Sequence, residues 1–121
     1  MSGFADPAAI QGWHAHLYCD PAEGSPTRAA GARLREAIAA AFPDAVLGRW
    51  HAAPVGPHPA PMFQVAFAPA LWPHLVPWLA LNRAGLTVLV HPETGRQKAD
   101  HLHHSIWMGA VLPLDASVLP D

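Results

Sequence analysis

Histidine is the residue type in this sequence with the most chemical potential. Nine of the 121 residues are histidines, and imidazole is both a common transition-metal ligand and an acid/base group that titrates near neutral pH. His14 and His16 alternate with Ala15 and Leu17, which is the period of a strand with one polar and one packing face. Their backbones would lie roughly 6.6 Å apart, so both rings could reach one ion. An isolated pair of this kind is more often solvated, so the other histidines decide the interpretation.

Four segments have the composition and period of strands, and two of them end in histidine; they cover residues 13–18, 45–51, 62–67 and 86–91. His51 ends the second segment and His91 ends the fourth. The third carries bulky apolar residues on one face, which leaves Gln64 on the opposite face. The histidines therefore recur at predicted strand ends.

Two helices are expected between these strands. Ser25-Pro26 supplies an N-cap and a first helical position, and apolar residues then recur at helical spacing as far as Phe42. The second helix is expected over 71–83, because Pro73 suits a first turn and Gly85 suits a C-cap. The order β-α-β-β-α-β predicts an α+β fold of the split βαβ type. Its four-stranded antiparallel sheet would have the order 4-1-3-2, with both helices on one face.

Further histidines lie outside the predicted strands. His58 lies in the connection 52–61, which contains four prolines and one glycine and is therefore expected to be stiff and extended. This connection is either one wall of a pocket or a plain structural link. His104 belongs to a tail with three histidines in four positions, and the segment 100–109 is expected to add at most a short fifth strand.

The predicted topology gathers several histidines on one sheet face. Strands one and four are antiparallel neighbours, so His14 should lie beside His91, and we expect His51 at the same end of the sheet. We predict a metal held by His14, His16 and His91, with His104 as a further ligand from the tail. The face that the helices leave uncovered would carry this site.

The ligand type narrows the choice of ion. Imidazoles without cysteine suit iron, zinc, copper or nickel, and an open site with two or three histidines suits non-haem Fe(II) chemistry with O₂. A site with two histidines and one carboxylate would need Glu93 or Asp100, and neither has an obvious strand position. A site made mostly of histidine is therefore favoured.

The composition bears on partners. Hydrophobic residues make up 51% and charged residues 13% of the chain, against a usual charged share of about 25%, so we expect a homodimer whose subunits cover the open sheet face. Seven Lys and Arg residues against nine Asp and Glu, with no basic run, argue against nucleic acid or an anionic membrane as partner.

Length and local composition bear on organisation. We expect a flexible arm over 1–12, a single domain over 13–115 and a tail over 116–121. No apolar run reaches the roughly 18 residues that span a bilayer, and the first twelve residues lack a signal-peptide pattern. The lone Cys19 has no internal disulfide partner. We therefore expect a cytoplasmic protein.

Seven short motifs taken together resemble the DOPA 4,5-dioxygenase family of fungi and bacteria. The resemblance covers roughly residues 13 to 115 and rests on His14-Ala15-His16-Leu17-Tyr18, Gly48-Arg49-Trp50-His51, Pro54-Val55-Gly56-Pro57-His58-Pro59, Pro61-Met62-Phe63-Gln64-Val65, Leu81-Asn82-Arg83, Leu86-Thr87-Val88-Leu89-Val90-His91-Pro92 and Ile106-Trp107-Met108-Gly109. It implies a ferredoxin-like α+β fold. It also implies extradiol ring cleavage of a catechol such as L-DOPA, with O₂ and non-haem Fe(II).

With that chemistry in view, further residues receive expected roles. Positioned acid/base groups would remove and return protons, and the candidates are His51, His58 and His104. A guanidinium binds carboxylates through two hydrogen bonds, so Arg49 is a candidate for a substrate carboxylate, although a surface ion pair explains it equally well. Tyr18 and Gln64 complete the expected substrate-binding set.

A second interpretation of the same pattern stays open. The chain could be a non-catalytic dimer that binds a metal or a small molecule, with its histidines around a structural zinc. A closed site with four protein ligands would favour that interpretation, and a site with open positions would favour the dioxygenase.

Overall fold

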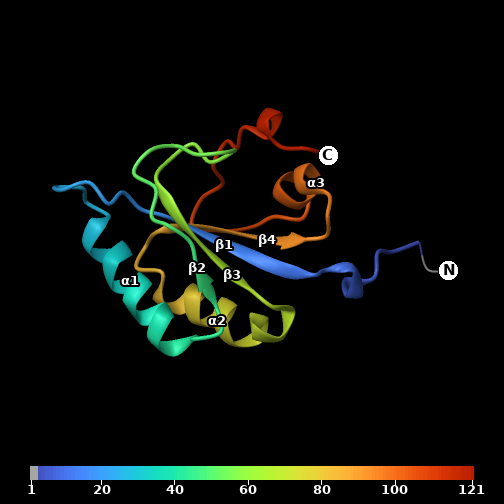
Figure 1. The fold of residues 1–121 in the computed structure, drawn as a ribbon, viewed down its shortest axis with the longest axis horizontal. Coiled ribbons are helices and arrows are strands. Elements are labelled where there is room, and N and C mark those ends of the chain that lie inside the picture. Colours follow the sequence, from blue (N-terminus) through green and yellow to red (C-terminus); the bar gives the residue numbers. More distant parts are fainter. Residues whose placement is uncertain (1–2) are drawn as a thin grey trace.

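A five-stranded antiparallel sheet in the order β2-β3-β1-β4-β5 lies at the centre of this computed structural model (Figure 1). The structure describes residues 3–121, so the first two residues of the expected arm lie outside it. The strands are β1 (Gly12–Tyr18), β2 (Val46–Leu47), β3 (Met62–Phe67), β4 (Thr87–Glu93) and β5 (Ile106–Met108). The α+β class is confirmed. The count of four strands is wrong, because Ile106–Met108 pairs with β4 and adds a fifth strand at that edge.

Two helices cover one face of the sheet (Figure 1). Helix α1 (Arg28–Ala41) begins three residues after the predicted cap, because the Ser25 hydroxyl accepts the Thr27 N–H in a local turn. Helix α2 (Trp72–Asn82) follows a short 3₁₀ turn, Pro69–Leu71. The core between helices and sheet is made of alternate strand residues and one stripe of each helix; its fully buried members include Leu17, Ile38, Phe63, Val65, Leu75, Leu79 and Val88.

Strand β2 is much shorter than the predicted 45–51. After Leu47 the chain leaves the ladder and returns only at one bridge between His51 and Met62. Between these points the Trp50 indole packs against Phe63 and donates to the Cys19 carbonyl at 2.8 Å. A core contact therefore replaces part of the predicted strand.

The position expected for His51 is also wrong. Strands β1 and β2 are each antiparallel to β3, so they run parallel to one another. His51 pairs with Met62, and Met62 pairs with Tyr18 at the end of β1. His51 therefore lies at the opposite end of the sheet from His14.

The second sheet face is covered by the chain itself. Residues 48–61, a third helix α3 (Gln97–Leu102) and the C-terminal segment lie over it (Figure 1). A small apolar cluster holds this cover in place: buried Tyr18, Met62 and Leu89, with Ala60, Trp107, Leu112 and Leu114 packed against them. The face that we expected a second subunit to cover is thus largely closed within one chain.

Helix α3 was not predicted, since six residues with little apolar periodicity look like a loop. Over the described residues no helix is both long and apolar enough to cross a membrane, the longest being α1 with 14 residues.

Candidate functional site

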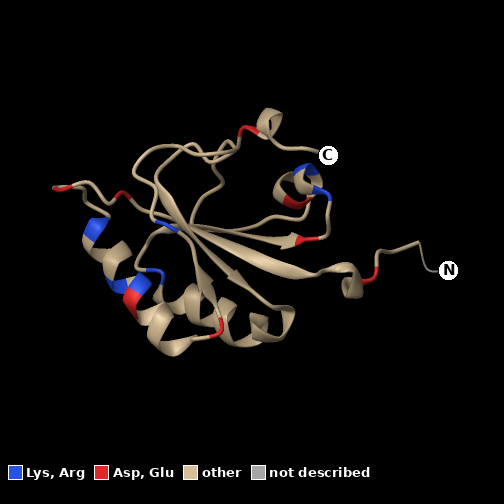
Figure 2. Cartoon of the chain, viewed as in Figure 1, with Lys and Arg blue, Asp and Glu red and all other residues tan. Residues whose placement is uncertain are grey.

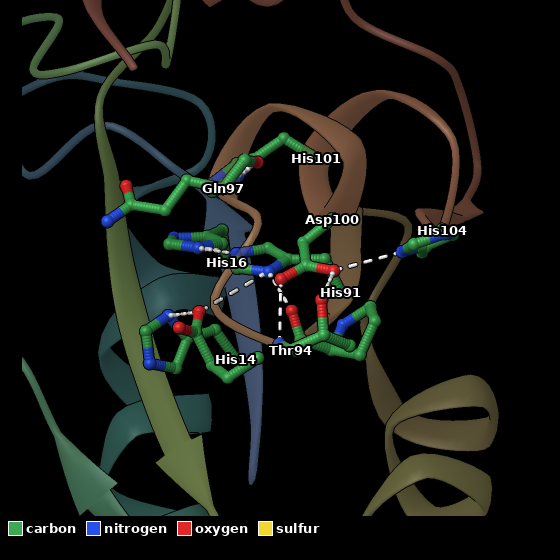
Figure 3. Close-up of polar contacts among 10 residues, drawn as sticks. His14, His16, His91, Thr94, Gln97, Asp100, His101 and His104 are labelled. Atoms are coloured by element: carbon green, nitrogen blue, oxygen red, sulfur yellow. Dashed lines mark hydrogen bonds and ion pairs between the residues drawn. The ribbon is translucent and has the colours of Figure 1, made fainter. Parts of the chain in front are cut away.

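The polar side of β1 and the end of β4 bring three histidines together, as predicted. The register pairs His14 with His91 and places His16 one step further along the same face. The ring centroids of His14 and His16 each lie 5.2 Å from that of His91. The Nε2 atoms of His16 and His91 are 3.1 Å apart (Figure 3).

Two further imidazoles extend this group. His58, from the proline-rich connection, stacks on His16 with the ring centroids 4.1 Å apart. His101, from α3, lies 3.9 Å from the His91 ring and 6.5 Å from the His16 ring. We call His14, His16, His58, His91 and His101 the histidine cluster; all but the partly exposed His14 are buried.

Hydrogen bonds fix the protonated nitrogen of two cluster members, and an ion-pair contact with a carboxylate favours the same nitrogen in a third. The Nδ1–H of His91 donates to the Pro92 carbonyl at 3.0 Å, and that of His101 donates to the Gln97 carbonyl at 2.7 Å. The Nδ1 of His14 lies 3.1 Å from a Glu93 carboxylate oxygen. Carbonyls and carboxylates only accept hydrogen bonds, so in each neutral ring Nε2 carries the lone pair. This is the arrangement by which proteins orient metal-binding histidines.

Burial disfavours the charged form of four cluster members. It lowers the pKa of His58 to about 4 and that of His91 to about 3, and the neighbouring imidazoles add to both shifts. Burial also lowers the pKa of His16 well below its usual value and that of His14 to a lesser degree, which the Glu93 carboxylate partly opposes. Neutral imidazole is the form that binds metal ions.

The donor set fits a divalent transition metal. Two overlapping groups of three have ligand atoms within 4.8 Å of one another: His14, His16 and His91, and His16, His58 and His101. Two imidazole nitrogens that bind one ion at about 2.1 Å lie about 3 Å apart when the nitrogen–ion–nitrogen angle is near 90°. The Nε2 atoms of His16 and His91 are 3.1 Å apart, which matches this spacing. The Nδ1 of His16 is buried without a hydrogen-bond partner among the described residues. A buried polar atom without a partner is unusual in a protein core. A ligand or metal ion bound at this nitrogen would supply the missing partner.

A cavity of about 230 Å³ adjoins the cluster; its walls are His14, His16, Pro57, His58, Gln64, Glu93, Gln97, His101 and Leu119. Of the expected substrate-binding residues, Gln64 lines this cavity. Tyr18 lies behind it, where its hydroxyl is 2.6 Å from Nδ1 of His58 and its ring stacks on Trp107.

None of Arg49, His51 and His104, which were also expected at the site, lines the cavity. Arg49 is exposed, and its guanidinium donates to Nδ1 of His51 at 3.2 Å. His104 is partly exposed, and its Nδ1–H donates to the Asp100 carboxylate at 2.9 Å. In Figure 3 His104 lies apart from the other labelled histidines.

Two residues at the site were not assigned from the sequence. His101 was passed over in favour of its neighbour His104, because the face that a residue presents cannot be inferred before the helix is known. Glu93 was set aside for want of a strand position, but β4 extends to it and its carboxylate meets His14. The available signal was the strand period, which continues from His91 to Glu93.

Comparisons with known proteins identify the family of this chain. The model of the Dopa 4,5-dioxygenase family matches residues 13–118. The chain belongs to the Dopa 4,5-dioxygenase family. The matched range contains all five members of the histidine cluster.

Individual relatives share the architecture and part of the sequence. A crystal structure from Nostoc punctiforme, described as that of a candidate dioxygenase, has a TM-score of 0.90 and 47% identity, with 96% of each chain covered. A DOPA 4,5-dioxygenase from Amanita muscaria is 31% identical over 116 residues, which are 92% of this chain and 50% of the relative. An uncharacterised 21.2 kDa protein from Botryotinia fuckeliana is 42% identical over 94 residues, which are 71% of this chain and 51% of that protein. The chain thus spans about half the length of the curated relatives it matches.

Proposed function

We propose that this chain is an extradiol dioxygenase that opens the ring of a catechol such as L-DOPA. Family membership supports a dioxygenase. The observation that carries the proposal is the histidine cluster beside a cavity, with Nδ1 of three rings facing a carbonyl or carboxylate oxygen. Both atoms of O₂ enter the ring-opened semialdehyde, so the reaction needs no outside reductant.

We propose Fe(II) as the resident metal, with His14, His16 and His91 as its ligands. When bound, Fe(II) supplies positions for the catechol oxygens and O₂ and a path for electrons between them. The protein's part is to hold these rings neutral and oriented. Glu93 and the Pro92 carbonyl do this for His14 and His91.

His58 is the preferred acid/base group among the three expected ones. It lines the cavity, whereas His51 and His104 do not. When its Nδ1–H donates to the Tyr18 oxygen, Nε2 is free to accept a proton from the catechol. Burial raises the pKa of Tyr18, so the phenol stays neutral and orients the ring of His58. Gln64, beside His16 in the β1–β3 register, supplies an amide to hydrogen-bond the substrate.

The test is anaerobic loading with Fe(II), addition of L-DOPA and exposure to air. We expect O₂ uptake and a yellow ring-opened product that cyclises. His58→Ala should keep its iron and lose about 10² to 10⁴-fold in turnover, the usual contribution of positioned proton transfer. Loss of iron and turnover together would make His58 a ligand instead. No O₂ uptake with any catechol at full iron occupancy would refute the proposal.

One observation favours the second candidate, a non-catalytic metal-binding protein. The two overlapping groups share His16, so further imidazoles lie beside either set of three as candidates for a fourth ligand. A closed tetrahedral site leaves no position for substrate. The visible absorption of the Co(II)-loaded protein separates these cases, because adding a catechol changes the spectrum only when coordination positions are open.

A further inference from the structure

The charge of the cavity wall has consequences for substrate choice. Among the described residues that line it there is no Lys or Arg, and the one charged side chain other than histidine is Glu93. Its Oε1 faces Nδ1 of His14 at 3.1 Å and Nδ1 of His91 at 3.6 Å. No ion pair or hydrogen bond to a described residue engages its Oε2, and the side chain is 34% exposed.

Glu93 also borders a second hollow. An open groove of about 280 Å³ shares His14 and Glu93 with the cavity and adds a further carboxylate, that of Asp44; its other walls are Gln11, Gly12, Trp13, Val46, Ala66, Phe67 and Ala68. The side chain of a bound catechol that leaves the cavity past Glu93 therefore meets two carboxylates.

The seven cations of the chain lie elsewhere. Three are on α1, on the far side of the sheet from α3 (Figure 2). Arg83 donates to the Leu86 carbonyl, and Lys98 pairs with Asp121 at 3.4 Å. Arg49, the expected carboxylate partner, is exposed beside His51, and Arg96 is exposed at the start of α3. A substrate carboxylate finds no Lys or Arg among the described residues of the cavity wall.

We propose that this cavity selects catechols by the charge of their side chain, favouring an ammonium group over a carboxylate, and that Glu93 is the residue that makes the distinction. The inference rests on the proposed catechol cleavage and names its substrate class. A catecholamine gains an ion pair with Glu93, while a catechol acid is repelled and finds no Lys or Arg to pair with its carboxylate. L-DOPA carries both groups and falls between these extremes.

A set of four catechols that share a two-carbon side-chain unit tests this selection. Dopamine carries the ammonium alone, 3,4-dihydroxyphenylpropionate the carboxylate alone, L-DOPA both, and 4-ethylcatechol neither. We expect kcat/KM of the Fe(II) protein to fall in the order dopamine, L-DOPA, 3,4-dihydroxyphenylpropionate. The first and last should differ by about tenfold, as suits a partly exposed charge that attracts one group and repels the other. The dissociation constants of the redox-inert Zn(II) protein should follow the same order.

Two substitutions separate charge from structure. Glu93→Gln keeps an oxygen acceptor for His14. It should reduce the ratio of kcat/KM for dopamine to that for 3,4-dihydroxyphenylpropionate from about tenfold to about twofold. Leu119→Arg places a cation in the cavity wall without replacing a histidine. It should favour the catechol that carries a carboxylate. Its matched control is Val118→Arg, at the neighbouring exposed position outside the wall, which should leave the order of substrates unchanged.

The outcomes distinguish this inference from the proposed function. Turnover in the reverse order, or a ratio that Glu93→Gln leaves unchanged, would overturn the charge selection and leave the dioxygenase standing. Binding to the Zn(II) protein in the expected order without turnover would overturn the dioxygenase alone. Absence of binding by all four catechols would overturn both.

Discussion

Removing the Asp100 carboxylate should loosen α3 and weaken the metal site. The side chain is 2% exposed and accepts three hydrogen bonds: from Thr94 N–H at 2.8 Å, from Thr94 Oγ1–H at 2.7 Å and from His104 Nδ1–H at 2.9 Å. It therefore ties α3 to Thr94, directly after β4, and to His104, directly after the C-cap of that helix. The next residue, His101, lies over the His91 ring.

The expected cost of Asp100→Ala follows from these contacts. Hydrogen bonds to a charged group contribute about 1.5 to 3 kcal/mol each. Thr94 and His104 are partly exposed, so water replaces some of what they lose. We expect the free energy of unfolding to fall by about 3 kcal/mol, a large part of the 5 to 15 kcal/mol that is usual for a domain. Affinity for Zn(II) should fall as well. His101 packs against the ring of the proposed ligand His91, and its helix would lose the hydrogen bonds that hold it in place.

Urea unfolding followed by tryptophan fluorescence and competition titration with a zinc chelator measure the two effects. His104→Ala is the matched control, since it removes one of the three hydrogen bonds from an exposed side chain and should cost about 1 kcal/mol or less. The reasoning is refuted if Asp100→Ala unfolds at the same urea concentration as the parent, or if His104→Ala costs as much as Asp100→Ala.

Four further predictions follow from single contacts. His16→Ala should lower bound iron well below one equivalent by metal analysis, whereas the exposed His103→Ala should not. Gly31→Ala should lower stability in urea by about 1 to 3 kcal/mol, because its Cβ would lie 2.7 Å from Cys19 Sγ and 2.8 Å from Trp50 Cζ2. Burial raises the pKa of Cys19 to about 12, only partly opposed by the charge of Arg35, so a disulfide reagent at pH 8 should label the protein only after unfolding. Light scattering at micromolar concentration should give about twice 12.9 kDa, since Val46 and Ile106 remain exposed on the two edge strands, and a monomer mass would contradict this.

The sequence predicted the strands and helices whose residue pattern is periodic. Alternation along 13–18 gave β1 and its two faces, and antiparallel pairing then brought His14 to His91, as the structure has it. Helical periods gave α1 and α2. In each case the local pattern extends over enough residues for the period to be read.

The predictions of secondary structure failed where a tertiary contact, rather than a local sequence pattern, determines the conformation of the chain. Helix α3 is too short to show a period and depends on Asp100 for its position. The second strand was overextended because the pattern of 45–51 does not show that Trp50 enters the core. Arg49 and His51 both belong to the predicted strand 45–51. Because β2 ends at Leu47, neither residue lies where that strand would have placed it.

The same division runs through the site. The proposed ligands His14, His16 and His91 come from regular strands, so a fixed register sets their spacing. His58 comes from a loop and His101 from a short helix. The Tyr18 hydroxyl holds the ring of His58, and the three hydrogen bonds of Asp100 hold the helix of His101. Leu119 reaches the cavity from a C-terminal segment that is joined to the proline-rich connection by the hydrogen bond from Asp115 N–H to the Pro57 carbonyl. Substitution of His58 or Leu119 should therefore alter proton transfer or substrate choice while the strand histidines keep the metal.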